Sequence, residues 1–212
     1  MKIESRKLGG DVNSAHPMPT LFFLRHGQAE HNVAAERDGP SAYSNPKNTD
    51  PHLTDKGRSQ VEAAGKQLKL RIGNRPVYVY SSPLIRTIET ADIICSHLKD
   101  NVVDRILHDG LLEQLHINHC CNWRMNRSQL ETKYPYWEGR LLPEIPPSQL
   151  NNEGDESVQM RINNFITLVK RLHTEQNSVI LLVSHHDTLK SYLQKKLENA
   201  EFEQEVYEVE GP

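Results

Sequence analysis

Two apolar segments that each run directly into a histidine constrain the fold of this chain more than any other feature. Residues 21–24 lead into Arg25 and His26, and residues 179–183 lead toward His185. Each segment has the length and the composition of a buried strand. Because ligand sites of α/β sheets form where parallel strands end, we expect both histidines to meet at one edge of a sheet.

Strand and helix patterns alternate along the rest of the chain, which predicts an α/β fold with a largely parallel sheet. Residues 77–80 form the next predicted strand. We expect Thr54 to cap one helix and Ser82 to cap another, with Pro83 at the first helical position of the second. The expected buried faces of the four longer helices are Val61, Ala64 and Leu68; Ile85, Ile88, Ala91, Cys95 and Leu98; Val158, Ile162, Phe165, Val169 and Leu172; and Leu189, Leu193 and Leu197.

The length of 212 residues fits a single domain, which we place at residues 19–200. Residues 1–18 are polar and read as a flexible lead-in. The composition of residues 38–52 predicts an irregular loop, and residues 108–150 predict a larger irregular excursion on the substrate side. Acidic and apolar residues alternate over 201–212, which fits either an edge strand or an acidic tail.

Composition narrows the class of protein. Charged residues make up 25% and hydrophobic residues 36%, with a formal net charge of −3. These values favour a soluble globular protein and give no reason to expect nucleic acid or a membrane as partner. Three cysteines, two of them adjacent, do not fit a secreted disulfide framework. We therefore expect a cytoplasmic protein, with the nucleus left open.

Four separated motifs carry a family resemblance. They are Arg25-His26-Gly27-Gln28 with Asn32, then residues 81–91 with Arg86, then Glu113, and then Ser184-His185. In this order the motifs resemble the histidine phosphatase superfamily, the phosphoglycerate-mutase-like group. The resemblance implies a three-layer α/β/α fold and no cofactor.

The resemblance also implies a role for each motif. His26 would be the nucleophile, Glu113 the proton donor, and Arg25, Arg86 and His185 the catalytic cradle that holds the phosphoryl group. This chemistry suits a phosphate monoester, which carries close to two negative charges and needs clustered cations and hydrogen-bond donors. The attacking nitrogen of the histidine must be neutral, and we expect a backbone carbonyl to hold the other ring N–H.

Other residues leave alternatives open. Glu30 and Glu36 also lie near the first motif and compete with Glu113 for the role of acid. Asn32 is expected to add a hydrogen bond to substrate. Arg124 is either a second substrate contact or an ordinary solvated arginine.

The chain also departs from the common family pattern in two places. His186 stands where many members have glycine. The stretch from Glu113 to Arg124 also differs from that of many mutases and, with Ser128, Leu130, Tyr134 and Pro135, is similar to the fungal and plant mutase-like phosphatases.

His116, His119, Cys120 and Cys121 form a cluster of metal-binding residue types. Their spacing does not match a structural zinc site, which needs two separated pairs of ligands. We therefore expect no metal in this protein.

The sequence as a whole predicts a metal-independent phosphomonoesterase that hydrolyses a small phosphorylated metabolite through a phosphohistidine at His26. Two alternatives remain on the same fold. One is a phosphoglycerate-type mutase or bisphosphatase, and the other is a scaffold that binds phosphorylated ligands without catalysis. The irregular segment 108–150 is expected to select the substrate, whose identity the sequence does not give.

Overall fold

The computed structural model describes residues 19–139, 141–147 and 152–207. Within these residues, strands form one five-stranded sheet in the order β3-β2-β4-β1-β5. The strands are β1 (Thr20–Arg25), β2 (Val77–Ser81), β3 (Val102–Leu107), β4 (Val179–Ser184) and β5 (Phe202–Val206). The first four are parallel to one another, and β5 runs antiparallel to β1. The predicted largely parallel sheet is therefore confirmed.

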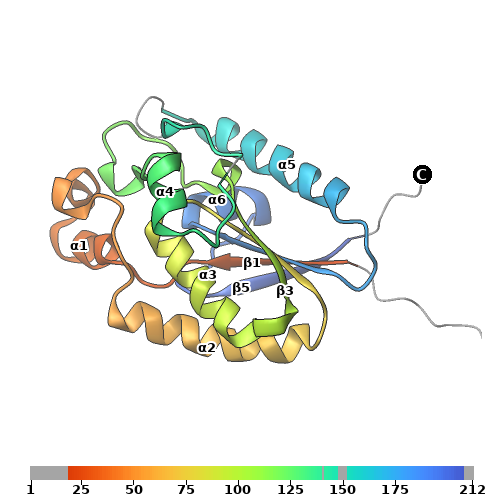
Figure 1. The fold of residues 1–212 in the computed structure, drawn as a ribbon. Coiled ribbons are helices and arrows are strands. Elements are labelled where there is room, and N and C mark those ends of the chain that lie inside the picture. The colour runs from red at the N-terminus through yellow and green to blue at the C-terminus, as the bar shows by residue number, and fades with distance from the viewer. Residues whose placement is uncertain (1–18, 140, 148–151, 208–212) are drawn as a thin grey trace, which may run out of the picture.

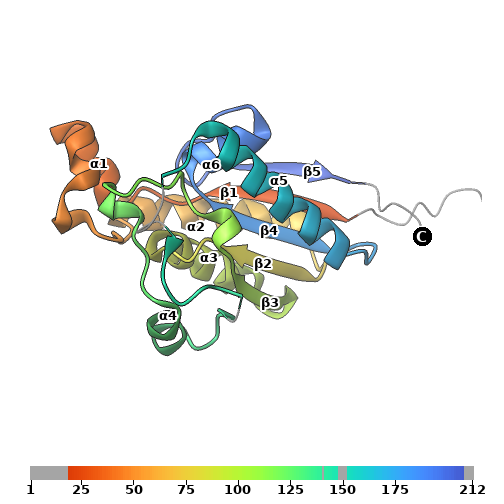
Figure 2. The ribbon, with the colours of Figure 1, turned by 90° about the horizontal axis from the view of Figure 1, so that it is seen from above.

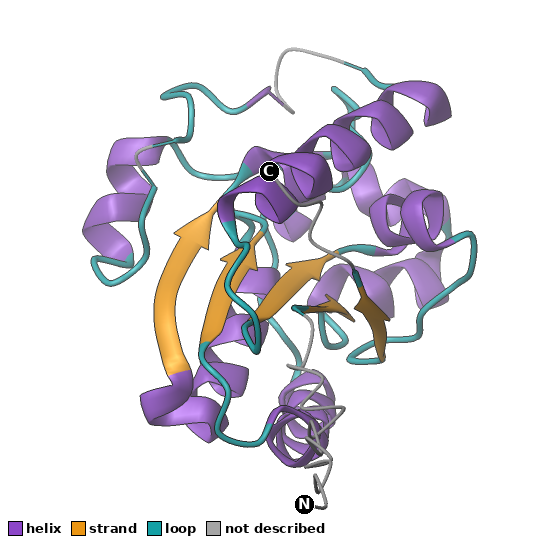
Figure 3. Ribbon diagram, turned by 90° about the vertical axis from the view of Figure 1, so that its right-hand side faces the viewer, coloured by secondary structure: helices purple, strands orange, loops and turns teal. Residues whose placement is uncertain are grey.

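Helices cover both faces of this sheet, which confirms the three-layer arrangement (Figures 1 and 3). The helices α2 (Asp55–Ile72) and α3 (Ile85–Leu98) pack on one face, and α5 (Asp155–Leu172) and α6 (His186–Leu193) pack on the other. Figure 2 shows α5 and α6 lying over the sheet on the side away from α2 and α3. Two short helices, α1 (Glu30–Asp38) and α4 (Arg127–Lys133), lie outside these layers.

Alternation within the strands divides the core into two parts. Phe22 and Leu24 of β1 pack with α2 and α3, whereas Leu21 and Phe23 pack with α5 and α6. Successive side chains of a strand point to opposite faces, so a strand covered on both sides must be apolar throughout. This requirement explains why β1 and β4 are unbroken apolar runs.

Helix ends and faces agree with the sequence in part. The Thr54 side chain accepts from the Gly57 N–H, so the predicted cap of α2 is confirmed. The predicted cap at Ser82 is wrong, because α3 begins at Ile85 with Leu84 before it. Leu172 was expected in the core but is 56% exposed, because α5 ends there.

Three elements differ from or refine the sequence predictions. Helix α1 and strand β3 were not predicted, since neither has a clear apolar period. For the C-terminal segment, the structure shows the edge-strand alternative over Phe202–Val206.

The remainder of that segment, 208–212, and the predicted lead-in, 1–18, lie outside the described residues. The described part of 108–150 consists of short helices and loops. None of the described helices is long and apolar enough to cross a bilayer.

Strand register positions the two histidines. Arg25 is paired with Ser184 in the β1–β4 ladder, so His26 and His185 follow at the same level. Strand β2 lies on the other side of β4, and its last residue, Ser81, is paired with Val183. Three strand ends thus deliver their next residues to one edge of the sheet.

A close backbone approach fixes the turn after β1 against the start of α2. A Cβ atom at Gly27 would lie 2.6 Å from the Gly57 carbonyl oxygen. A Cβ at Gly57 would overlap the carbonyl oxygen of Gln28. Both positions require glycine because the neighbouring atoms belong to the backbone and cannot move independently.

We expect Gly57→Ala to lower the free energy of unfolding by about 1–3 kcal/mol, the usual cost of inserting a methyl group into a filled space. Denaturant unfolding measures this change. Gly139→Ala is the matched control, since a Cβ there has its nearest neighbour at 3.4 Å. Equal unfolding midpoints for the two variants would contradict the prediction.

Candidate active site

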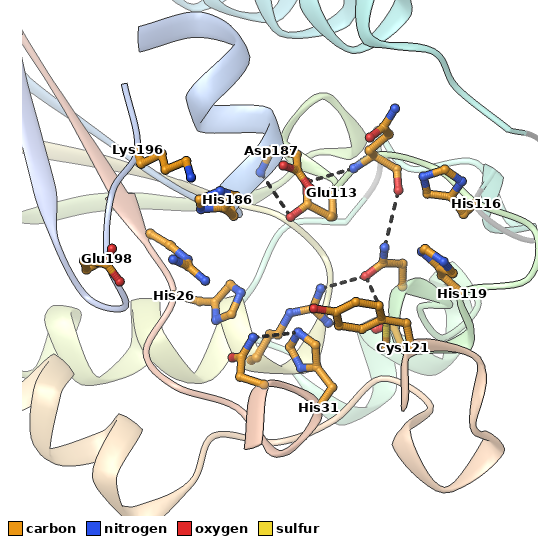
Figure 4. A pocket seen from close by; sticks show the side chains of 16 residues that line it. His26, His31, Glu113, His116, His119, Cys121, His186, Asp187, Lys196 and Glu198 are labelled. Atoms are coloured by element: carbon orange, nitrogen blue, oxygen red, sulfur yellow. Dashed lines mark hydrogen bonds between the residues drawn. The ribbon is translucent and has the colours of Figure 1, made fainter. Parts of the chain in front are cut away.

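A cavity of about 330 Å³ lies at the edge of the sheet where β1, β2 and β4 end. Figure 4 shows the side chains that surround it. Its lining consists of Arg25, His26, His31, Asn32, Tyr43, Arg86, Glu113, Gln114, His116, His119, Cys121, Asn122, His186, Asp187, Lys196 and Glu198. Five of the residues predicted to be catalytic or to bind substrate are in this set: two arginines, one histidine, one asparagine and one glutamate.

His26 has one ring nitrogen fixed and the other free. Its Nδ1 lies 2.7 Å from the carbonyl oxygen of Gly27, and this oxygen can only accept a hydrogen bond. Nδ1 therefore carries the proton, and Nε2 keeps its lone pair. Burial and the nearby charge of Arg86 hold the pKa of His26 well below its usual value, so the ring is neutral at physiological pH. The expected carbonyl contact is confirmed.

His185 lies beside His26, with ring centroids 5.2 Å apart. It is fully buried behind the cavity lining. Its Nε2 is 2.8 Å from the hydroxyl oxygen of Ser82, and its Nδ1 has no partner among the described residues. Burial and Arg86 lower its pKa, so the ring is neutral. If the hydroxyl donates to Nε2, the single ring proton is on the buried Nδ1, for which the described residues supply no partner.

Arg86 is buried and held in place from two sides. One terminal nitrogen donates to the carbonyl oxygen of Cys121 at 2.8 Å, and the other donates to Oδ1 of Asn122 at 2.9 Å. Its Nε has no partner among the described residues. Asn122 was not singled out from the sequence, where nothing distinguishes it from other loop asparagines.

Arg25 is the last residue of β1 and lines the same cavity. One terminal nitrogen donates to the carbonyl oxygen of Leu197 at 2.8 Å. Burial lowers its pKa, while Glu113 and Glu198 act in the opposite direction. Because a guanidinium stays charged even so, the two arginines give the cavity lining a positive charge suited to a phosphoryl group.

Glu113 is held at the N-terminal end of α6. Its Oε1 accepts from the backbone N–H of Gln114 at 2.9 Å and of Thr188 at 3.2 Å. Its Oε2 accepts from the backbone N–H of Asp187 at 3.3 Å. Burial, followed by the negative charge of Asp187, raises the pKa of Glu113 above its ordinary value. A carboxyl with a raised pKa is suited to proton transfer.

The two glutamates that compete with Glu113 for the role of acid lie outside the cavity. Glu30 lines a different cavity, and Glu36 is exposed on α1. Neither lines the cavity that contains His26. Asp187 lines this cavity next to Glu113.

Asn32 lines the cavity, but its side chain already has partners. Its Oδ1 accepts from the backbone N–H of Ala29, and its amide nitrogen lies 3.3 Å from Nε2 of His31. These contacts fix the start of α1. Its contact with a substrate stays a prediction.

Arg124 does not reach this cavity. Its side chain is fully buried and makes a two-point ion pair with Asp109, at 3.0 and 3.2 Å. It also donates to the carbonyl oxygens of Met125 and Pro143. The Arg124 guanidinium thus connects separate segments of the irregular region. Both predicted alternatives, a substrate contact and a solvated arginine, are therefore wrong.

The histidine and cysteine cluster divides between the cavity and its surroundings. His116, His119 and Cys121 line the cavity, whereas the thiol of Cys120 donates to backbone oxygens of the 3₁₀ segment near Tyr43. In the described part of the chain, no three His, Cys, Asp or Glu residues are placed to hold a metal ion. His186, the departure from glycine, also lines the cavity.

We expect Ser82→Ala to free the ring of His185 and to weaken binding of inorganic phosphate roughly ten- to hundredfold, the effect of losing one hydrogen bond that supports a charged contact. Calorimetry measures the affinity, and imidazole nitrogen shifts by NMR report the tautomer. Ser96→Ala, which removes an exposed hydroxyl on α3, is the control. Unchanged phosphate affinity and unchanged nitrogen shifts would refute this role of Ser82.

Comparison with known proteins places this site in a family. Residues 21–205 match the family model of the histidine phosphatase superfamily, branch 1. A phosphoglycerate mutase-like protein of Arabidopsis thaliana is 40% identical over 77 residues, which are 36% of this chain and 28% of that protein. A probable phosphoglycerate mutase of Arthroderma benhamiae is 33% identical over 150 residues, covering 63% of this chain and 44% of that protein. The chain thus spans less than half the length of either relative.

A solved structure shares the fold. The ecdysone phosphate phosphatase of Bombix mori, in complex with tungstate, has a TM-score of 0.62 and 16% sequence identity over 92% of each chain. Most of this chain matches the family model, in the same region that contains the paired histidines, the two arginines and the glutamate. The chain belongs to the histidine phosphatase superfamily.

Proposed function

We propose that this protein is a metal-independent phosphomonoesterase that acts through a phosphohistidine at His26. The observation that carries the proposal is the state of this ring. The Gly27 carbonyl holds the Nδ1 proton, and burial keeps the ring neutral. The lone pair on Nε2 is therefore available for attack on phosphorus in a cavity whose lining includes two arginines.

The phosphoryl group would bind between Arg25, Arg86 and His185. These groups neutralise the negative charge of the oxygens as it develops, which is the task that a metal ion performs in other phosphoryl-transfer enzymes. Arg86 is held rigidly by Cys121 and Asn122, so its donors need little reorganisation on binding.

Reaction would proceed in two displacements. In the first, Nε2 of His26 forms a bond to phosphorus while the ester P–O bond breaks, and Glu113 gives its proton to the leaving oxygen. In the second, the Glu113 carboxylate takes a proton from water as that water attacks the phosphohistidine. Inorganic phosphate and the neutral imidazole are released, and Glu113 is again protonated.

We favour a hydrolase over an enzyme that transfers the phosphoryl group to a second hydroxyl, because the cavity is open to water. Three exposed side chains, Asp187, Lys196 and Glu198, form part of its lining. A mutase has to keep water from its phosphoenzyme. The second candidate, a phosphoglycerate-type mutase or bisphosphatase, is supported by the descriptions of the plant and fungal relatives.

A scaffold that binds without catalysis is the least supported function. Such a protein would not need a nucleophile with a fixed tautomer. Here His26 has this fixed tautomer, and Glu113 has a raised pKa in the same cavity.

We expect His26→Ala to lower hydrolysis of an aryl phosphate by more than about a thousandfold, because the variant lacks the nucleophile. The wild-type rate should be unchanged in excess EDTA. His52→Ala, an exposed histidine outside the cavity, serves as control. Loss of the wild-type activity in EDTA would overturn the mechanism. Transfer of phosphate between the hydroxyls of phosphoglycerate, dependent on a bisphosphate primer, would instead show a mutase.

We expect Glu113→Gln to lower kcat for an alkyl phosphate by about 10²- to 10⁴-fold, because an alkoxide needs a proton to leave. An aryl phosphate, whose leaving group is far less basic, should lose much less. Since the pKa of Glu113 is raised, its protonated form persists to higher pH than in an ordinary carboxyl. The wild-type kcat for the alkyl substrate should then fall as pH rises through that pKa, and the variant should lack this limb.

Asp187→Asn is the matched control for this prediction, since Asp187 lies beside Glu113 in the same cavity. We expect it to have a smaller effect on the difference between the two substrates. Equal losses for the alkyl and aryl phosphates in Glu113→Gln would exclude this glutamate as the proton donor.

A further inference from the structure

One side of the cavity is formed by three rings, Tyr43, His116 and His119, which we call the ring wall. The centroids of Tyr43 and His119 are 5.6 Å apart, and those of His116 and His119 are 4.4 Å apart. In Figure 4, His116 and His119 lie on the side of the cavity opposite Lys196 and Glu198. All three rings are half-buried, so each keeps surface that a ligand can contact.

The ring wall is continuous with the nucleophile. His31 lies 6.2 Å from Tyr43 and 5.9 Å from His26, measured between ring centroids. The organic group of a phosphate ester bound at His26 would therefore lie along these rings if it points toward the wall.

The two halves of the wall come from different segments that are fastened together. Tyr43 belongs to the 3₁₀ helix Pro40–Ser44, and His119 precedes the 3₁₀ helix Cys120–Asn122. The thiol of Cys120 donates to the Asn45 carbonyl at 3.0 Å and lies 3.5 Å from the Tyr43 carbonyl. The wall is thus formed before a ligand binds, which lowers the entropic cost of binding.

Charge favours a neutral ligand on this side. In the described lining, the cationic side chains besides histidine are Arg25, Arg86 and Lys196. Lys196 lies near Glu198, on the side of the cavity opposite His116 and His119 (Figure 4). Burial raises the pKa of Tyr43 and lowers the pKa of His119, so both rings are uncharged at neutral pH. None of the three wall residues carries a permanent positive charge, and the terminal nitrogens of the neighbouring Arg86 already donate to Cys121 and Asn122.

We propose that the ring wall binds the leaving group of the substrate, and that this group is an uncharged alcohol bearing an aromatic or heteroaromatic ring. The inference rests on the proposed function of the same site. A planar ring stacks on the wall in offset or edge-to-face contact, while its phosphate sits over the two arginines. The wall therefore selects ring-bearing monoesters over small anionic esters such as phosphoglycerates.

Binding of stable phosphonates tests the proposal independently of turnover. The probes are 2-phenylethylphosphonate, 2-cyclohexylethylphosphonate of similar size, and 3-carboxypropylphosphonate, which carries a carboxylate. We expect the phenyl compound to bind about five- to tenfold more tightly than the cyclohexyl compound, the usual effect of an aromatic contact. The carboxylate compound should bind most weakly. Calorimetry on the full chain gives all three affinities.

Substitutions distinguish binding of the organic group at the ring wall from binding of the phosphoryl group. Tyr43→Leu keeps an apolar side chain but removes the ring, and it should abolish the preference for phenyl over cyclohexyl while leaving the affinity for inorganic phosphate unchanged. Tyr136→Leu, which removes an exposed tyrosine outside the cavity, should leave both unchanged. Equal binding of the phenyl and cyclohexyl compounds, tightest binding of the carboxylate compound, or an unaltered preference in Tyr43→Leu would each overturn the proposal.

Hydrolysis of 2-phenylethyl phosphate and butyl phosphate distinguishes failure of the inference from failure of the proposed function. Their leaving alcohols have similar acidity, so a higher kcat/KM for the phenyl ester reflects binding of the ring. If neither ester is hydrolysed but the phosphonates still bind in the expected order, the phosphatase function is rejected and the ring wall is kept. Hydrolysis of both esters with equal kcat/KM would reject the ring wall and keep the phosphatase.

Discussion

The parallel pairing of β1 with β4 is the constraint on which the active site depends. Arg25 lies opposite Ser184 in this ladder, and the next residue of each strand is a histidine. A shift of one residue would turn every side chain of the strand to the other face of the sheet. Since both faces are covered by helices, the apolar packing that stabilises the sheet also fixes the distance between His26 and His185.

Burial then sets the chemistry of these groups. The same removal from water keeps His26 and His185 neutral and raises the pKa of Glu113. A neutral ring can attack phosphorus, and a protonated carboxyl can donate to a leaving oxygen. Contacts of His26 Nδ1 with the Gly27 carbonyl and of His185 Nε2 with the Ser82 hydroxyl leave the other nitrogen of each ring without a partner in the described part of the chain. Desolvation and orientation therefore act together, and neither alone would produce a reactive site.

The irregular segments have a separate task. Residues 40–48 and 114–122 contain short 3₁₀ helices that contact each other, and they supply the rings of Tyr43, His116 and His119 to the cavity lining. The side chain of Asn122 and the carbonyl of Cys121 hold Arg86 from this same region. In the function that we propose, one pair of loops would both select the leaving group and hold Arg86 rigid. Changes in loop sequence could then alter the substrate while the residues at the strand ends stay the same.

The sequence by itself determined the α/β class, the buried strands, and the motif residues that the structure brings to one sheet edge, because apolar periodicity and strand-end motifs are local. It also indicated that a backbone carbonyl would hold one ring N–H of His26. It did not give the partner of Ser82, the place of Asp187, or the ion pair that removes Arg124 from the cavity. Each of these depends on a contact between segments distant in the chain, where residue type leaves the partner open. Only the tertiary structure decided them, because packing selects one partner from several that are chemically equivalent.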